Sequence, residues 1–245
     1  MHGIGGVPLS SMGGGALGTY AGKVLSTGPI AYWPLWETSG ATAQCLVNSA
    51  QNGTYVNATV GSGTAPTGLA CPWFDGAGDA VDVYSVTLAG AFNVSEGSLA
   101  LWAKVNAIGV WTDGAVRMPA SFGADAINNF VRFDKTAINN RLDYYYKANG
   151  VLEANTVTPI TDTAWMHLVI TWSVSNDRVC YYQNGASAGA CDNTLGAWAG
   201  ALAANLCVVG AQTNLGGFSF HGWISDAALW DRELALTTIQ NLYVI

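Results

Sequence analysis

Short runs in which apolar and polar residues alternate recur along the chain from about residue 30 to its end. A period of two places successive side chains on opposite faces of a strand, so each run predicts a half-buried β-strand. The runs cover residues 30–33, 80–84, 98–104, 130–133, 142–147, 166–172, 178–182, 205–209 and 222–230. Residues 234–243 differ, because their apolar side chains recur at helical spacing and predict a closing helix.

Turn residues separate the predicted strands. Glycine follows aspartate, asparagine or glycine in the pairs that begin at Asp113, Asn149, Asn184 and Gly216. Such pairs adopt the left-handed backbone conformations that tight hairpins require. Many short strands joined by these turns indicate an all-β sandwich or barrel, and we find no internal repeat.

Residues 1–28 follow neither period. Nine of them are glycine, and Lys23 is the only charged residue among the first 36. We therefore expect an extended N-terminal arm or anchor at residues 1–28, followed by one domain at residues 29–245. An uncharged arm is poorly solvated, which favours docking onto a coat protein or another copy of the chain. A disordered tail is the alternative.

Composition narrows the classes of partner. The 245 residues carry a net charge of −7, are 50% hydrophobic and only 10% charged, and have a mean hydropathy of +0.25. Without a basic stripe we expect no nucleic-acid binding, and without an apolar run of about 18 residues we expect no membrane span. The high hydropathy favours a surface covered by a partner, although abundant alanine and glycine explain it equally well.

The five cysteines, at positions 45, 71, 180, 191 and 207, contain no C-x-x-C pair, so no zinc or redox motif is expected. Cys180 and Cys191 flank the Asn184-Gly185 turn. With a two-residue turn Cys180 faces Gly189, so a Cys180–Cys191 disulfide requires a bulge. Buried thiols are the alternative.

A series of motifs, in order along the chain, resembles the laminin-G-like domains of the concanavalin-A-like lectin/glucanase superfamily. The resemblance covers about residues 30–245 and implies a two-sheet antiparallel jelly-roll sandwich. The motifs are Phe74-Asp-Gly-Ala-Gly-Asp79, the strand at 98–104, Trp165-Met-His-Leu-Val169, Tyr182-Gln-Asn-Gly185, Phe220-His-Gly-Trp-Ile-Ser-Asp226 and Trp230-Asp-Arg-Glu-Leu234.

The resemblance also suggests a structural calcium ion. It places Asp226 near the glycine turn that carries Asp79, and Ca²⁺ prefers oxygen ligands of this kind. We therefore predict Ca²⁺ held by Asp79, Asp226 and backbone carbonyls. Two observations oppose this prediction: aspartates commonly cap their own turns, and Ser225 and Asn184 stand where the family often has carboxylates.

Catalysis is not expected. Retaining glucanases need two carboxylates about 5–5.5 Å apart, supplied in this superfamily by a Glu-x-Asp-x-Glu strand. The four glutamates of the chain, at positions 37, 96, 153 and 233, are isolated from one another. No Gly-x-Ser-x-Gly elbow is present, and we expect buried His167 to be a hydrogen-bonded structural group.

Aromatic residues supply the candidate ligand site. Exposed tyrosine and tryptophan rings stack on the C–H faces of sugars. Tyr144 and Tyr146 share one face of a predicted strand, and Trp111 and Asp113 lie in the irregular stretch 106–129. These four residues are the predicted ligand-binding residues, and burial in the core is the alternative for the rings.

These observations predict a non-catalytic surface recognition module that binds a glycan or a cell-surface receptor. The N-terminus lacks the features of a signal peptide, and a virion component released by lysis does not need one. We therefore expect an extracellular or virion-surface protein that is displayed on a larger assembly such as a phage. The competing hypothesis is a purely structural virion protein, a capsid decoration or tail component. It would be anchored through residues 1–28 and would bind no glycan.

Overall fold

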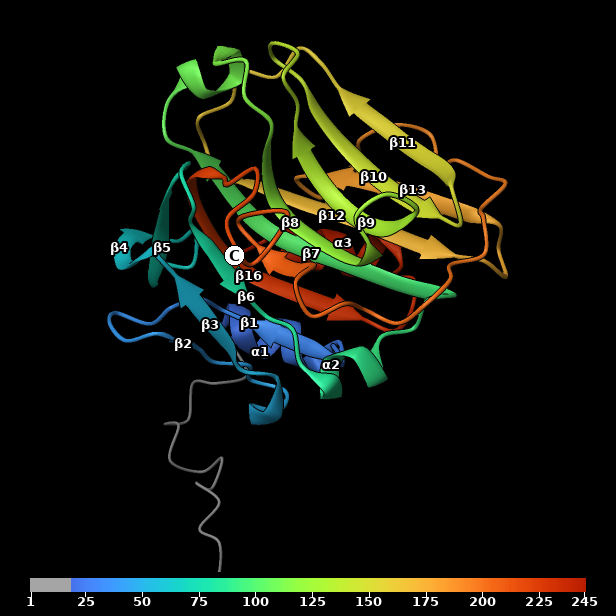
Figure 1. Ribbon diagram of the computed structural model, residues 1–245, viewed down its shortest axis with the longest axis horizontal. Helices are drawn as coiled ribbons and strands as arrows, with labels where there is room; N and C mark the ends of the chain where they lie inside the picture. The colour runs from blue at the N-terminus through green and yellow to red at the C-terminus, as the bar shows by residue number, and fades with distance from the viewer. Residues whose placement is uncertain (1–18) are drawn as a thin grey trace, which may run out of the picture.

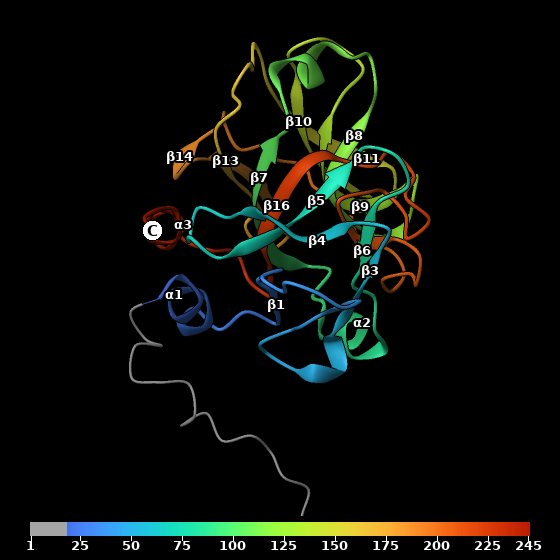
Figure 2. The same cartoon turned by 90° about the vertical axis from the view of Figure 1, so that its left-hand side faces the viewer.

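The structure is a computed structural model, and it describes residues 19–245. Two antiparallel sheets of eight strands each pack face to face, as Figures 1 and 2 show, which confirms the predicted jelly-roll sandwich. We name them sheet A, with the order β14-β13-β12-β7-β16-β5-β4 and with β1 paired to β16, and sheet B, with the order β11-β10-β9-β8-β15-β6-β3-β2.

The strands of sheet A are β1 (Ala31–Trp33), β4 (Thr59–Thr64), β5 (Ala70–Asp75), β7 (Glu96–Val105), β12 (Met166–Ser173), β13 (Arg178–Gln183), β14 (Ala186–Ser187) and β16 (His221–Trp230). Those of sheet B are β2 (Thr42–Ala43), β3 (Gly53–Val56), β6 (Ala80–Asp82), β8 (Arg117–Asp125), β9 (Asn129–Lys135), β10 (Leu142–Ala148), β11 (Val151–Val157) and β15 (Cys207–Val209). The helices are α1 (Tyr20–Ser26), α2 (Val86–Ala91) and α3 (Leu236–Tyr243), and the 3₁₀ turns are η3 (Ser49–Gln51) and η4 (Ile108–Thr112).

The core between the sheets is rich in aromatic residues. Strand alternation sends Leu99 and Leu101 of β7 inward, where they join Trp33, Trp172 and Phe122 in one buried cluster. The indole N–H of Trp33 donates to the Gln51 carbonyl at 2.8 Å, so this large ring is buried without an unpaired donor.

The outer face of sheet A is also buried, because α1 and α3 lie on it. Figure 2 shows both helices on the side of sheet A that faces away from sheet B. Tyr20 and Val24 of α1 and Ile239 of α3 pack with Trp102 and Trp230 of the sheet in a second apolar cluster. Within residues 19–245, none of the helices has the length and apolar character needed to span a membrane.

The prediction of an irregular arm at residues 1–28 is wrong for its last part. Thr19 caps α1 by accepting the Gly22 N–H, and Tyr20 and Val24, four residues apart, form its buried face. A helix of seven residues is too short to show a clear period in the sequence. Residues 1–18, the rest of the predicted arm, lie outside the described residues.

Of the two alternatives for Cys180 and Cys191, the structure has the disulfide, together with the bulge that it requires. Tyr182 pairs with Ser187 around the two-residue turn, whereas Val179 pairs with Asp192, so the register shifts by two residues between these pairs. The shift brings Cys180 opposite Cys191, and the two form a disulfide with Cα atoms 4.3 Å apart. Cys45, Cys71 and Cys207 are free and buried.

The stretch 106–129 is more ordered than predicted, since it contains η4 and the whole of β8. The alternation pattern did not predict β8, because Pro119 and Gly123 interrupt the alternation and the pairing of β8 with β9 is irregular at two points. The strand extends the sheet toward β9, β10 and β11, whose outer face carries the candidate site.

Candidate ligand-binding site

The three predicted ligand-binding rings lie in the core, and this part of the prediction is wrong. Trp111 is 1% exposed and donates its indole N–H to the Asp162 carbonyl at 2.8 Å. Tyr144 and Tyr146 are fully buried, and the ring of Tyr146 stacks on Trp172. None of these rings is available to a ligand from solvent.

Asp113 has a structural role. Its carboxylate accepts hydrogen bonds from Lys135 at 2.5 Å and from Arg117 at 2.7 Å, tying the end of η4 to β8 and β9. Burial raises the pKa of Asp113, but the hydrogen bonds from Lys135, the Ala115 N–H and Arg117 outweigh it and hold the pKa below its ordinary value. The carboxylate is therefore already neutralised within the protein.

The predicted calcium ligands do not fit a metal site. Asp79 accepts the N–H of Asp75, which itself caps the turn through the Ala77 N–H, as the turn-capping alternative requires. The buried Asp226 accepts the Tyr32 hydroxyl at 2.6 Å, and burial raises the pKa of Asp226 to about 6, which disfavours the charged form that calcium needs. Residues 19–245 contain no group of three or more His, Cys, Asp or Glu side chains placed to hold a metal.

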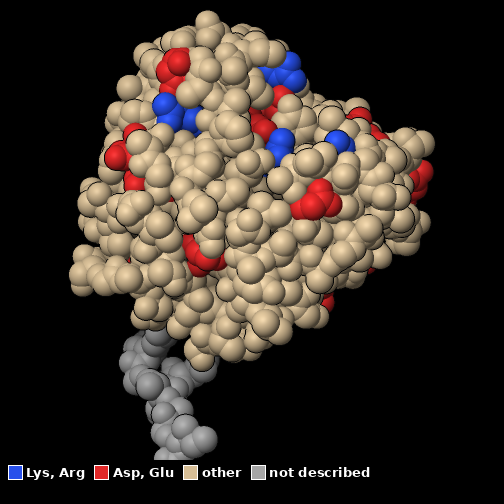
Figure 3. Space-filling view, in the orientation of Figure 1, with Lys and Arg blue, Asp and Glu red and all other residues tan. Residues whose placement is uncertain are grey.

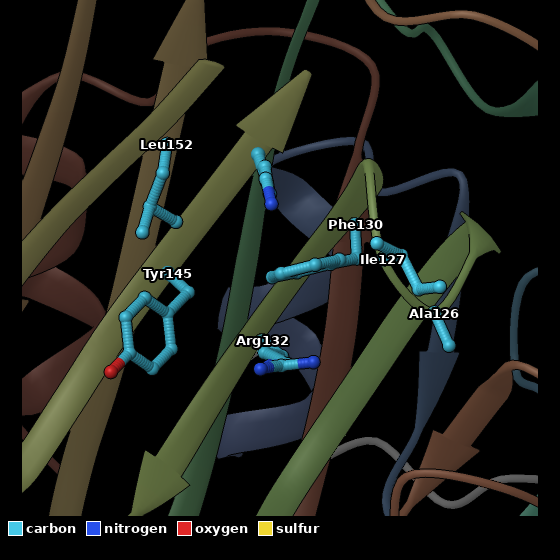
Figure 4. Close-up of a pocket in the computed structure, with 7 residues that line it drawn as sticks. Ala126, Ile127, Phe130, Arg132, Tyr145 and Leu152 are labelled. Atoms are coloured by element: carbon cyan, nitrogen blue, oxygen red, sulfur yellow. The ribbon is translucent and has the colours of Figure 1, made fainter. Parts of the chain in front are cut away.

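An open depression of about 350 Å³ lies on the outer face of sheet B. Figure 4 shows that its side chains come from β9, β10, β11 and the turn between β8 and β9. We call it the sheet B depression and define it by Ala126, Ile127, Phe130, Arg132, Tyr145, Lys147 and Leu152. Strand pairing sets Arg132 beside Tyr145 and Phe130 beside Lys147, so these four side chains share one face.

Arg132 is held between two aromatic rings. The centre of its guanidinium lies 4.0 Å from the centroid of Phe130 and 5.4 Å from that of Tyr145, both within cation–π range. Its Nε lies 3.1 Å from Oδ1 of Asp134, which makes the two side chains an ion pair, although the N–H is not aligned with the oxygen for a hydrogen bond. The guanidinium is thus positioned by the two rings and by this ion pair.

Tyr145 is oriented by a buried carboxylate behind it. Asp143 is fully buried and accepts the Tyr145 hydroxyl at 2.5 Å, the Thr156 hydroxyl at 2.8 Å and a two-pronged contact from Arg141. Burial and the bond to Asp143 raise the pKa of Tyr145 to about 12, so the phenol stays neutral at physiological pH. Its ring is therefore fixed before any ligand arrives.

Lys147 and two apolar side chains form the rim. Within the described part of the chain, Lys147 makes neither an ion pair nor a hydrogen bond. Ile127 is 69% exposed and Leu152 49% exposed. In Figure 3 the visible Lys and Arg side chains all lie over the upper half of the molecule, where Figure 1 places β8 to β11. The depression combines apolar, aromatic and cationic groups that face solvent.

The sequence contains a signal for this site, which the prediction of Tyr144 and Tyr146 as ligand-binding residues did not use. Alternation puts Asp143, Tyr145 and Lys147 together on one face of the strand. Two charged neighbours mark that face as the solvent side, so Tyr145 is the tyrosine that points outward.

Comparison with solved structures shows the same fold. The Trypanosoma rangeli sialidase, solved in complex with 2,3-difluoro-KDN, matches 90% of this chain with a TM-score of 0.65 at 13% identity, and the match spans 33% of the sialidase. The receptor binding domain of botulinum neurotoxin C/D mosaic serotype matches 89% of the chain at TM-score 0.64 and 12% identity, over 51% of its own length. The Ruminococcus gnavus IT-sialidase CBM40, bound to α2,3 sialyllactose, matches 68% at TM-score 0.54 and 10% identity, over 92% of its length.

A search of curated protein sequences gives no match. A profile of the concanavalin A-like lectin/glucanases superfamily, in its laminin G form, matches residues 75–240. This match covers more than half of the chain and runs from the last residue of β5 into α3. The chain belongs to the concanavalin A-like lectin/glucanases superfamily.

Proposed function

We propose that this chain is a non-catalytic recognition module that binds a glycan through the sheet B depression. The observation that carries the proposal is the Phe130–Arg132–Tyr145 stack, which faces an open depression of about 350 Å³. The half-buried Tyr145 ring offers a face for sugar C–H groups, and a guanidinium beside it donates to sugar oxygens.

The construction of the depression supports binding without chemistry. Its lining residues include no carboxylate, whereas glycoside hydrolysis by the retaining mechanism requires two. Tyr145 and Arg132 are held in place by Asp143 and Phe130, so little side-chain entropy is lost when a ligand binds. A fixed, open surface of this kind suits one face of a saccharide.

The structural neighbours favour the same class of function. One is a carbohydrate-binding module solved with a bound saccharide, and another is a toxin domain that binds a receptor. Both of these neighbours are recognition domains of this fold. In the second form of the proposal, the ligand of this chain is a protein receptor instead of a free glycan.

The Cys180–Cys191 disulfide favours an extracellular location, because such bonds persist in oxidising compartments. Display on a virion and anchoring through residues 1–28 stay predictions. The structural-protein hypothesis shares these two predictions and differs in expecting no glycan binding, so a binding assay separates the two.

The test is a glycan array probed with the full chain and two ring-deletion variants. Tyr145→Ala removes the ring at the depression, and Phe218→Ala removes a ring that is 49% exposed on a loop outside the depression. We expect wild type and Phe218→Ala to bind the same glycans and Tyr145→Ala to lose at least about tenfold of the affinity, as loss of a stacking ring implies. Glycan binding that survives Tyr145→Ala would move the site elsewhere, and no binding by a folded wild type would favour the structural hypothesis.

A further inference from the structure

We infer that the sheet B depression selects saccharides that carry a carboxylate, which is held by the outer nitrogens of Arg132 and by the ammonium group of Lys147. The inference rests on the proposed function, since it names the chemical class of ligand for the same depression. It follows from one cation of this acidic chain that has no partner among the described residues, from a second cation that keeps free donors, and from where the two lie.

Most cations of the chain are already engaged by protein groups. The chain has nine Lys and Arg against 16 Asp and Glu, so partners are plentiful. Lys23 donates to the Val244 carbonyl, and Lys104 lies over the Trp223 ring. The ion pairs are Arg117–Asp113, Arg132–Asp134, Lys135–Asp113, Arg141–Asp143, Arg178–Glu233 and Arg232–Asp231.

Lys147 is the exception, and it lines the depression together with Arg132. Among the described residues Lys147 has no acidic or ring partner. Arg132 forms an ion pair with Asp134 through its Nε, but its two terminal nitrogens have no hydrogen-bond partner among the described residues. A chain with a net charge of −7 therefore places an unpaired ammonium group and a guanidinium with free donors side by side on one open face.

The two charges are spaced for one ligand group. Arg132 pairs across the strands with Tyr145, and Lys147 lies two residues further along β10 on the same face. Such diagonal neighbours lie about 7–8 Å apart at their backbones, so a single charged sugar reaches both side chains. The guanidinium presents two parallel N–H donors, which match the two oxygens of a carboxylate better than any neutral hydroxyl.

The local carboxylates compensate Arg132 only in part. Asp143 is already bound by Arg141. Asp134 is buried beside Arg132, and burial raises the pKa of Asp134 to about 7 despite the nearby guanidinium, so a fraction of it is neutral at physiological pH. The flanking rings of Phe130 and Tyr145 keep water from two sides of Arg132, which strengthens its attraction for an anion.

The test uses an array that carries neutral, carboxylate-bearing and sulfated forms of the same saccharide cores. Lys147→Gln removes the unpaired charge with little risk to the fold, and Arg132→Lys keeps a charge but loses the two-pronged geometry. Lys104→Gln is the matched control, because Lys104 also lacks an acidic partner but lies on the outer face of sheet A.

We expect carboxylated glycans to bind at least about tenfold more tightly than their neutral forms, from one charge-assisted contact. Lys147→Gln and Arg132→Lys should each reduce that preference by about fivefold or more, while Lys104→Gln leaves it unchanged. Preference for neutral glycans, preference for sulfated over carboxylated glycans, or indifference to both substitutions would each overturn the inference and leave the proposed function standing. A folded protein that binds no glycan on the array would overturn both.

Discussion

The two outer faces of the sandwich both carry aromatic side chains, but helices cover rings on only one of them. On sheet A, Trp102 donates its indole N–H to the Tyr20 hydroxyl and Trp230 donates to Thr27, each at 2.9 Å, so α1 and its end satisfy the polar atoms of the rings that they cover. On sheet B, Tyr145 lies beside Arg132 and Lys147 with no helix over it. The comparison teaches that an outward aromatic residue indicates a ligand site only where the chain itself does not cover it.

Removal of a covered ring should have the largest effect. Trp102 is 3% exposed and packs between the sheet and both helices. Trp102→Ala should lower the free energy of unfolding by about 3–5 kcal/mol, because it leaves a cavity and an unpaired Tyr20 hydroxyl. Denaturant unfolding measures this loss, and a change below about 1 kcal/mol would show that the helices do not stabilise this face.

The disulfide at the edge of sheet A should rank next. The double substitution Cys180→Ser with Cys191→Ser opens a loop of 11 residues, which should cost about 3 kcal/mol through the entropy of the unfolded chain. The glycan signal should not change at a temperature where both proteins are folded, because the bridge lies in sheet A. Lost binding by a folded double variant would mean that the covered and open faces are coupled.

A buried aspartate on each face makes a third contrast. Burial raises the pKa of Asp226 from 3.8 to about 6. Protonated Asp226 therefore stabilises the folded protein at low pH, and this stabilisation is lost as pH rises through 6. Asp226→Asn keeps the acceptor for Tyr32 and suits the left-handed backbone at φ 56°. The substitution should raise the free energy of unfolding by roughly 2–3 kcal/mol above pH 7 and by almost nothing below pH 4. An equal gain at both pH values would exclude ionisation as its cause.

The matched change on sheet B should act in the opposite direction. Asp143 is equally buried but bound by Arg141, Tyr145 and Thr156. Asp143→Asn should therefore cost about 1–3 kcal/mol, because it removes the charge that pairs with Arg141. Thermal unfolding at pH 7 measures the change in stability for Asp226→Asn and for Asp143→Asn. Stabilisation by both substitutions would contradict the distinction between a paired and an unpaired carboxylate.

Substitution on the open face should have the smallest effect on stability. Lys147 makes no ion pair within residues 19–245, so Lys147→Gln should change the free energy of unfolding by no more than about 0.5 kcal/mol. The same substitution should weaken the binding of carboxylated glycans. A large loss of stability would place Lys147 among the structural residues of sheet B instead.

Much of the fold could be predicted from the sequence, because strand alternation is a strong local signal. The run at 98–104 lies within β7, the turn at Asn184 joins β13 to β14, and the helix at 234–243 contains α3. The short helix α1 could not be predicted, since its seven residues owe their stability to packing on Trp102 and Trp230.

The candidate site was harder to predict than the fold. Alternation shows that Tyr144 and Tyr145 point to opposite faces but not which face is inside, and only Asp143 and Lys147 resolve it. The stack of Arg132 on Phe130 depends on the pairing of β9 with β10, which no local pattern reveals. The choice of Asp226 as a calcium ligand met a related difficulty, because the sequence does not show that this carboxylate accepts the Tyr32 hydroxyl.

The central claim is that the open face of sheet B, and not the covered face of sheet A, binds a saccharide. Amide chemical shifts of the isotope-labelled full chain, recorded while the best carboxylated glycan of the array is added, test it most directly. We predict shifts that saturate and concentrate in residues 126–132 and 143–154, around Arg132, Tyr145 and Lys147. Shifts concentrated in α1, α3 or β16, with residues 126–154 unchanged, would contradict it.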